Sequence, residues 1–137
     1  MVERAINILE KLVGIDSISG RPTHAIVGYI KEYLEGQGLE VALSFDEAGE
    51  RANVYATIGP EKDGGVVLNG HTDVVAVEGQ IWATDPFKLT RKGDRFYGRG
   101  SVDMKGFLAC VMASVPIFKA ADLKHPIHIA FTFDEET

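Results

Sequence analysis

The sequence predicts an α/β domain, because helical patterns alternate with short strand-like segments along the whole chain. Apolar residues recur at helical spacing in three segments, near residues 2–14, 23–36 and 104–121. Strand-forming residues gather in four others, at 39–45, 53–59, 66–68 and 127–133. A length of 137 residues suits one domain with its own core. We therefore expect an α/β domain of the three-layer α/β/α type.

The first two segments are predicted to be amphipathic helices. In the first, the apolar residues that share one face are Val2, Ile6, Leu9, Leu12 and Val13, and the helix is expected to end near Gly14. The second follows the turn-rich loop "SISGRPT", with Thr23 as the expected N-cap. Its buried face consists of Ile26, Ile30 and Leu34, in steps of four.

The middle of the chain is predicted to form strands and a hairpin. The stretches "LEVALSF" and "NVYATIG" have strand composition, and Gly59-Pro60 closes the second. Val66, Val67 and Leu68 form a continuous apolar run, which is typical of a strand covered on both faces. The stretch "FKLTRKGDRFYG" indicates two short strands joined at Gly93 and its neighbours.

The last third predicts one more helix and one more strand. Apolar residues between Met104 and Ala121 supply a buried stripe, and Pro116 within it is expected to kink or split the helix. Cys110, without a partner thiol, is expected to be a small core residue. The final strand spans residues 127–133.

The composition excludes several classes of function. Apolar residues make up 45% and charged residues 25%, with a net charge of −6 and no basic stripe, which argues against a nucleic-acid partner. No apolar run reaches membrane-spanning length, and the N-terminus is not a signal peptide, so no membrane partner is expected. A single cysteine forms no internal disulfide and fits a reducing cytoplasm.

Three polar clusters follow predicted strands or their loops: "NGHTDVV", "GRGSVDMKG" and "TFDEET". In open α/β sheets, ligands bind beyond the carboxyl ends of the strands, where such loops converge. His71 and Asp73 lie two residues apart and point to the same side of an extended segment, so the carboxylate could orient the imidazole. A simple His–Asp pair near a turn is the alternative explanation.

Asp103 follows His71 by 32 residues, within a glycine-rich loop. The alternative to a ligand role for Asp103 is that of helix N-cap. The acidic residues Asp134, Glu135 and Glu136 repel one another, and a solvated turn is the usual explanation for such a triplet. The strongly apolar strand before them shifts the interpretation toward a bound cation.

Together the clusters offer one imidazole and several carboxylates from three separate loops. This ligand set suits Zn²⁺, Co²⁺ or Mn²⁺ better than Ca²⁺. Several carboxylates per imidazole indicate a two-metal site, with ions roughly 3.5–4 Å apart, that lowers the pKa of bound water from about 15.7 toward about 7. The sequence therefore predicts metal-assisted hydrolysis, and it contains no local Ser–His–Asp or Cys–His pattern.

Four motifs carry a resemblance to a known family. In order, they are "GHTDVV", Trp82 with Pro86 and Phe87, "YGRGSVDMKG" and "FDEET". Over essentially all its length the chain resembles the zinc-dependent aminoacylase and carboxypeptidase family. Within that family, "DPFKLTRKGDRFYGRGSVDMKGFLA" and "KHPIHIAFTFDEET" are most similar to members that hydrolyse N²-acetylornithine to ornithine and acetate in arginine biosynthesis.

The resemblance implies a role for each site residue. His71 is similar to a ligand of one zinc, Asp103 to the carboxylate that bridges both metals, and Glu136 to a ligand of the second zinc. Asp73 is similar to the catalytic-site partner that orients His71. Glu135 is similar to the general base, and Asp134 is expected to be a turn residue. The family's cofactors are two Zn²⁺ per complete site, or Co²⁺, and the peptide bond after Asp103 is expected to be cis.

The family's members are considerably longer than 137 residues. They have a further acidic ligand, a lid or dimerisation domain, and a histidine ligand late in the chain. The resemblance therefore implies that residues 1–137 are the N-terminal part of a three-layer α/β/α, zinc-peptidase-like catalytic domain. That domain is incomplete at its C-terminal side, and residues 1–137 alone are expected to be inactive or nearly so. It also implies a small N-acyl amino acid as substrate and, for the longer parent, a homodimer.

Other functions remain open at this point. The chain could belong to another zinc deacylase, a desuccinylase or a carboxypeptidase of the same family. It could be a non-catalytic metal-binding remnant. The third alternative is an α/β fragment whose acidic residues are merely solvated.

Overall fold

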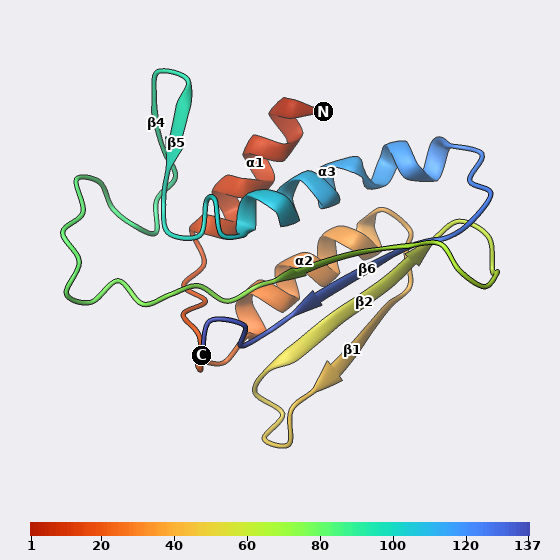
Figure 1. Cartoon of the computed structure of the whole chain (residues 1–137), viewed down its shortest axis with the longest axis horizontal. Coiled ribbons are helices and arrows are strands. Elements are labelled where there is room, and N and C mark those ends of the chain that lie inside the picture. The colour runs from red at the N-terminus through yellow and green to blue at the C-terminus, as the bar shows by residue number, and fades with distance from the viewer.

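A computed structural model describes all residues 1–137 and shows one mixed sheet with helices packed against it (Figure 1). In chain order, the elements are α1 (Val2–Val13), α2 (His24–Gly36), β1 (Val41–Phe45), β2 (Ala52–Ile58), β3 (Val66–His71), β4 (Thr90–Lys92), β5 (Arg95–Tyr97), α3 (Lys105–Ala120) and β6 (Ile127–Thr132). This confirms the α/β class. None of the three helices has the length and apolar character of a membrane-spanning segment.

The four long strands lie in the order β1-β2-β6-β3. β2 is antiparallel to both β1 and β6, whereas β3 and β6 are parallel, with Val66 opposite Ile127 and His71 opposite Thr132. The last residue of β3 and the last residue of β6 therefore lie side by side. The chain leaves both strands at the same end of the sheet, which is where the predicted polar clusters begin.

One face of the sheet holds the hydrophobic core. Alternate residues of β2, from Ala52 to Ile58, are buried, as are Ile129 and Phe131 of β6. These side chains form one cluster with the apolar faces of α1, α2 and α3, with α1 packed on α3. The alternation of buried and exposed residues follows from the two-residue period of a strand.

Within residues 1–137, all three helices lie on the same face of the sheet. The opposite face presents Tyr55 and Thr57 of β2 and His128 of β6. The His128 Nδ1 lies 2.8 Å from the Tyr55 hydroxyl and 2.9 Å from that of Thr57. These polar groups satisfy one another there without a helix above them.

The prediction that β3 is covered on both faces is wrong. β3 is the edge strand and pairs with β6 alone, and Val66 and Val67 are 59% and 57% exposed. Only the carboxyl end of β3 is buried, at Gly70 and His71. A local apolar run indicates a strand but does not show whether other elements cover it.

The predicted helices differ from the structure in detail. Thr23 precedes α2, but its hydroxyl accepts the Ala52 N–H at 2.9 Å instead of capping its own helix. α3 continues through Pro116 as one helix, so the alternative of a split helix is wrong. Cys110 is exposed and not part of the core, because the buried stripe of α3 is centred on Leu108 and Met112.

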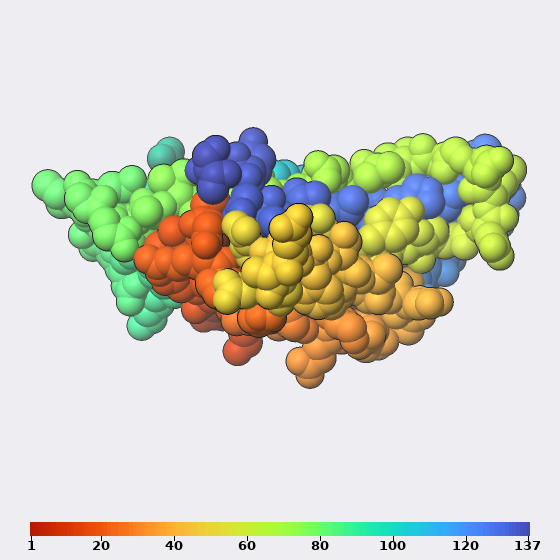
Figure 2. All heavy atoms as spheres, turned by 90° about the horizontal axis from the view of Figure 1, so that it is seen from below, coloured from red at the N-terminus to blue at the C-terminus, as the bar shows by residue number.

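The segment between β3 and α3 extends beyond the helix–sheet body. It contains the predicted hairpin, β4 paired with β5, and Gly93 has a φ of +65° in the turn between them. Figures 1 and 2 show that this segment, coloured green to teal, projects at one end of the molecule.

We predict that Phe131→Ala lowers the free energy of unfolding by about 3–5 kcal/mol, because it removes a fully buried ring from the central strand β6. Phe45→Ala is the matched control, since Phe45 lies exposed on edge strand β1 and its loss should cost less than about 1 kcal/mol. Urea unfolding of both variants measures the difference. Equal losses would show that the core does not lie on this face.

Candidate metal centre

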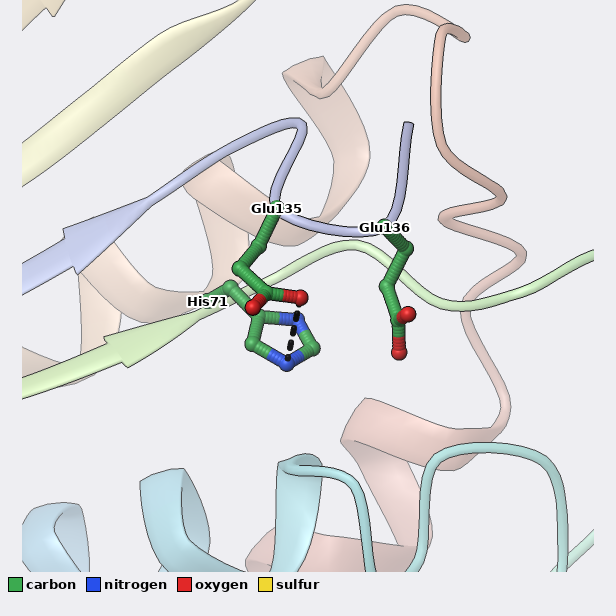
Figure 3. Close-up of side chains that lie close together, drawn as sticks. All are labelled: His71, Glu135 and Glu136. Atoms are coloured by element: carbon green, nitrogen blue, oxygen red, sulfur yellow. Dashed lines mark ion pairs between the residues drawn. The ribbon is translucent and has the colours of Figure 1, made fainter.

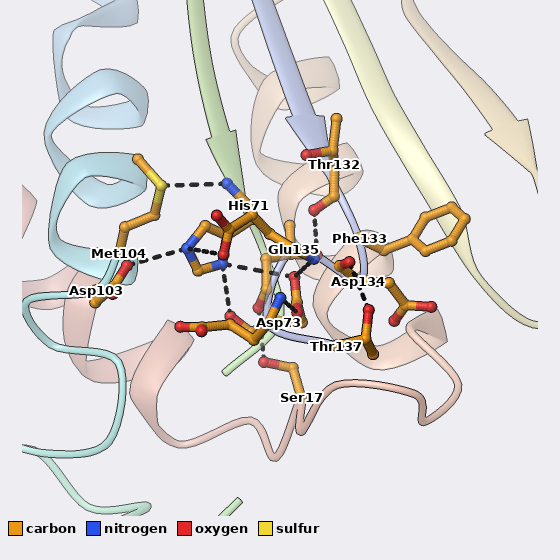
Figure 4. Close-up of polar contacts among 12 residues, drawn as sticks. Ser17, His71, Asp73, Asp103, Met104, Thr132, Phe133, Asp134, Glu135 and Thr137 are labelled. Carbon is orange, nitrogen blue, oxygen red and sulfur yellow. Dashed lines mark hydrogen bonds and ion pairs between the residues drawn. The ribbon is translucent and has the colours of Figure 1, made fainter. Parts of the chain in front are cut away.

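His71 ends β3 and is the buried centre of the site, with 5% of its surface exposed. Its Nδ1 lies 2.9 Å from the backbone carbonyl oxygen of Asp73, and its Nε2 lies 3.0 Å from Oδ1 of Asp103 (Figure 4). Its backbone N–H donates to the sulfur of Met104 at 3.3 Å. The ring is therefore fixed from both sides.

These contacts determine which ring nitrogen can bind a cation. A carbonyl oxygen only accepts hydrogen bonds, so Nδ1 carries the proton that the Asp73 carbonyl accepts. Nε2 then directs its lone pair at a carboxylate oxygen, and a proton or a metal ion is needed between them. Burial lowers the pKa of His71, but the carbonyl of Asp73 and the carboxylate of Asp103 outweigh it and raise that pKa above its ordinary value.

Asp73 has two separate functions in the structure. Its carbonyl orients His71, while its carboxylate, 3.5 Å from Nδ1, accepts the backbone N–H groups of Glu135 at 3.2 Å and Glu136 at 3.0 Å. Burial, at 2% exposure, raises the pKa of this carboxyl, but the hydrogen bonds that it accepts, chiefly the one from the Glu136 N–H, together outweigh burial and lower the pKa below its usual range. The carboxylate thus fixes the acidic turn, whereas the sequence predicts only that it orients His71.

Asp103 lies in the loop before α3, and its side chain is 73% exposed. The N-cap position of α3 is Met104, with no side-chain cap bond, so the alternative role of Asp103 as a helix cap is wrong. The carboxylate instead faces His71 across 3.0 Å. The peptide bond between Asp103 and Met104 is cis, as the family resemblance implies.

Glu135 and Glu136 reach the same place from the turn after β6. An oxygen of Glu135 lies 3.8 Å from Nε2 of His71. One ligand atom from each of His71, Glu135 and Glu136 lies within 4.8 Å of the others (Figure 3). Burial raises the pKa of Glu136, and the negative charges of Asp103, Glu135 and Asp73 raise it further. A cation would relieve this repulsion.

Asp134 points away from the centre, as expected for a turn residue. Its φ is +59°, and its carboxylate accepts the Gly20 N–H at 3.0 Å and pairs with Arg51. Arg51 also pairs with Asp46 at 2.8 Å, on the loop that joins β1 to β2. Of the three consecutive acids, the first therefore anchors the turn and the other two face the imidazole.

The donor set fits a divalent cation. It combines a ring nitrogen whose lone pair faces inward with carboxylates from two loops, the combination that zinc and cobalt prefer. A solvated acidic turn would leave these side chains dispersed, whereas here they converge on a buried imidazole. The structure thus brings together His71, Asp103, Glu135 and Glu136, and their roles toward a metal stay predictions.

Some residues that support the site carry no recognisable signal in the sequence. The Ser17 hydroxyl donates to the Thr72 carbonyl at 2.8 Å, beside His71. Lys105 is fully buried, and its Nζ donates to the Ile15 carbonyl at 2.8 Å. Burial lowers the pKa of Lys105 to about 8. A lysine is usually solvated, so its position below the Asp103 loop could not be predicted from local pattern.

Known proteins provide an independent comparison. The chain is 33% identical to acetylornithine deacetylase of Buchnera aphidicola subsp. Schizaphis graminum, over 96% of this chain and 36% of that protein. It is 36% identical to acetylornithine deacetylase of Pasteurella multocida, over 90% of this chain and 32% of that protein. The chain therefore spans about a third of the length of these curated relatives.

Solved structures share the fold. Human carnosine dipeptidase 1 superposes with a TM-score of 0.83 at 27% identity, over 98% of this chain and 32% of that one. The M20 family metallo-carboxypeptidase Sso-CP2 from Sulfolobus solfataricus gives 0.82 at 27% identity, over 96% and 31%. The sequence model of peptidase family M20/M25/M40 matches residues 67–137, the part that holds His71, Asp103 and the acidic turn. This chain belongs to peptidase family M20/M25/M40.

Proposed function

We propose that this chain provides the first part of a two-metal catalytic domain that hydrolyses the amide bond of a small N-acyl amino acid. The observation that carries the proposal is the convergence of one inward-facing imidazole nitrogen with carboxylates from two other loops. The likeness to acetylornithine deacetylases supports N²-acetylornithine as the substrate, with ornithine and acetate as products in arginine biosynthesis. The single cysteine is consistent with action in the cytoplasm.

The residues that would hold the metals are His71, Asp103 and Glu136. Asp103 lies on the open side of the imidazole and has a second carboxylate oxygen free, which suits a bridging role. Zinc or cobalt, when bound, polarises the scissile carbonyl and makes water more acidic. Asp73 keeps His71 in the tautomer that leaves Nε2 available.

Glu135 is the proposed general base. Its carboxylate lies beside Nε2 of His71 but is largely exposed, so substrate and water can reach it. In this role it takes a proton from the attacking water and delivers it to the leaving amine. The Asp73 carboxylate holds the Glu135 backbone N–H, which fixes the point from which the side chain extends.

Since the chain spans about a third of its relatives, we propose that the remaining metal ligands and most substrate contacts come from outside these residues. On this proposal residues 1–137 alone hydrolyse little or no substrate, and the longer enzyme is a homodimer. A carboxypeptidase or dipeptidase activity is the second candidate, because the solved structures of such enzymes superpose with TM-scores of 0.82 and 0.83.

We predict that the chain binds about one or two zinc or cobalt ions and that His71→Ala or Glu136→Ala abolishes this binding. Both variants remove a side chain of the converging cluster. The matched control is His24→Ala, which removes an exposed histidine on α2 and should retain full metal content. Elemental analysis and cobalt absorption spectra measure the binding. Metal loss in the control, or no metal in the unaltered chain, would contradict the assignment.

We predict that Asp73→Asn weakens metal affinity about 10–100-fold, as losses of residues that orient ligands typically do. An asparagine cannot accept the Glu135 and Glu136 N–H groups with the strength of a carboxylate. Competition with a chelator measures the affinity, and circular dichroism checks the fold. An unchanged metal affinity in a folded variant would show that metal binding does not depend on the hydrogen bonds between the Asp73 carboxylate and the acidic turn.

The chemistry is testable in a chimera in which this chain replaces the matching 36% of the Buchnera acetylornithine deacetylase. We expect hydrolysis of N²-acetylornithine, and we expect Glu135→Gln to lower kcat about 10²–10⁴-fold with metal retained. Glu32→Gln, at an exposed position on α2, is the control. A folded, metal-loaded chimera that cleaves dipeptides but not the acetyl substrate would favour the second candidate. One that cleaves neither would indicate a non-catalytic metal-binding segment.

A further inference from the structure

The projecting segment has an unbalanced charge. Residues 80–99 contain five cations and two acids, a net charge of +3, so the rest of the chain sums to −9 within a total of −6. The cations are Lys88, Arg91, Lys92, Arg95 and Arg99. None of them takes part in an ion pair, although other basic residues of the chain do. A positive surface therefore stands without internal compensation on an acidic protein.

A pocket of about 540 Å³ lies within this surface, between the loop after residue 79 and the β4–β5 hairpin. Two cations, Lys92 and Arg99, line it together with the aromatic rings of Trp82 and Tyr97. No acidic residue lines it. The pocket thus presents two positive charges and an apolar surface to a bound ligand.

Arg99 is held in place before any ligand arrives. Its guanidinium stacks over the Trp82 ring at 5.1 Å, and one of its N–H groups donates to the side-chain oxygen of Gln80. The Trp82 indole N–H donates to the same oxygen at 3.2 Å. The Nε of Arg99 is buried and has no hydrogen-bond partner. The remaining N–H groups of the guanidinium are not used in these contacts and can donate to an anion in the pocket.

Lys92 provides the second charge, with its Nζ 5.6 Å from the centre of the Tyr97 ring. We propose that this pocket binds a phosphate monoester, at a site separate from the metal centre. A monoester carries a charge of about −1.5 to −2 at neutral pH, which matches the two cations, and the arginine fork suits phosphate oxygens. The ester's organic group would lie against Trp82, Tyr97 and the fully exposed side chain of Ile81.

The proposal does not depend on metal binding, because no residue of the metal centre lines the pocket. Trp82 is the only tryptophan in the chain, so its fluorescence reports on this pocket alone. The experiment titrates the full chain with phenyl phosphate and with inorganic phosphate. A chelator removes metal ions, and the ionic strength is held constant. We expect a saturable change in emission, with phenyl phosphate binding more tightly than phosphate.

Arg99→Gln should weaken phenyl phosphate binding roughly tenfold or more, because hydrogen bonds to charged groups are worth this much. Arg99→Lys keeps the charge without the fork and should give an intermediate loss. The matched control is Arg95→Ala, a hairpin cation that does not line the pocket, which should change affinity less than about twofold. Circular dichroism establishes that each variant is folded. The absence of saturable binding, or an equal loss in Arg95→Ala, would overturn the proposal.

Discussion

The parallel pairing of β3 with β6 is the constraint on which the site depends. It places His71 opposite Thr132, so that the imidazole and the acidic turn emerge at one end of the sheet from positions 61 residues apart. Side chains alternate between the two faces of a strand, and a slip of one residue in β3 would carry the imidazole to the other face. The core residues of β6, Ile129 and Phe131, hold the register because they can be buried on one face only.

Within that frame, a single buried carboxylate connects the two strand ends. Asp73 follows β3, and its oxygens accept the N–H groups of Glu135 and Glu136, which follow β6. A charged acceptor with two backbone donors is a strong connection in a buried place. Its own carbonyl meanwhile aligns His71. The orientation of the imidazole and the placement of Glu135 and Glu136 therefore depend on the same residue.

The sequence predicts the local secondary structure well, but it predicts poorly which elements cover one another in space. The helices, the hairpin and the polar clusters follow from periodicity and turn residues, which are properties of short segments. The exposure of Val66 and Val67 does not, because coverage of a strand depends on distant elements. Cys110 was misplaced for a similar reason, since one position on a helix can lie just outside the buried stripe.

At the candidate site, too, local features could be predicted and contacts between distant residues could not. Residue types at His71, Asp103 and the acidic turn indicated a cation, and the family motifs supplied their expected roles. The actual work of the Asp73 carboxylate could not be predicted, because its partners lie more than 60 residues away in the chain. The same holds for Lys105, whose buried amine finds a carbonyl 90 residues distant. Such contacts arise from the pairing of β3 with β6 and the packing of α3, not from local pattern.

The ion pairs of Arg51 with Asp134 and with Asp46 connect the acidic turn to the loop between β1 and β2. Asp134 immediately precedes the two glutamates, while Asp46 and Arg51 bracket the loop between β1 and β2. Through these ion pairs, the loop restrains the position of the turn that carries Glu135 and Glu136. A substitution at Asp46 or Arg51, neither of which belongs to the cluster around His71, can accordingly change the spacing of the two glutamates.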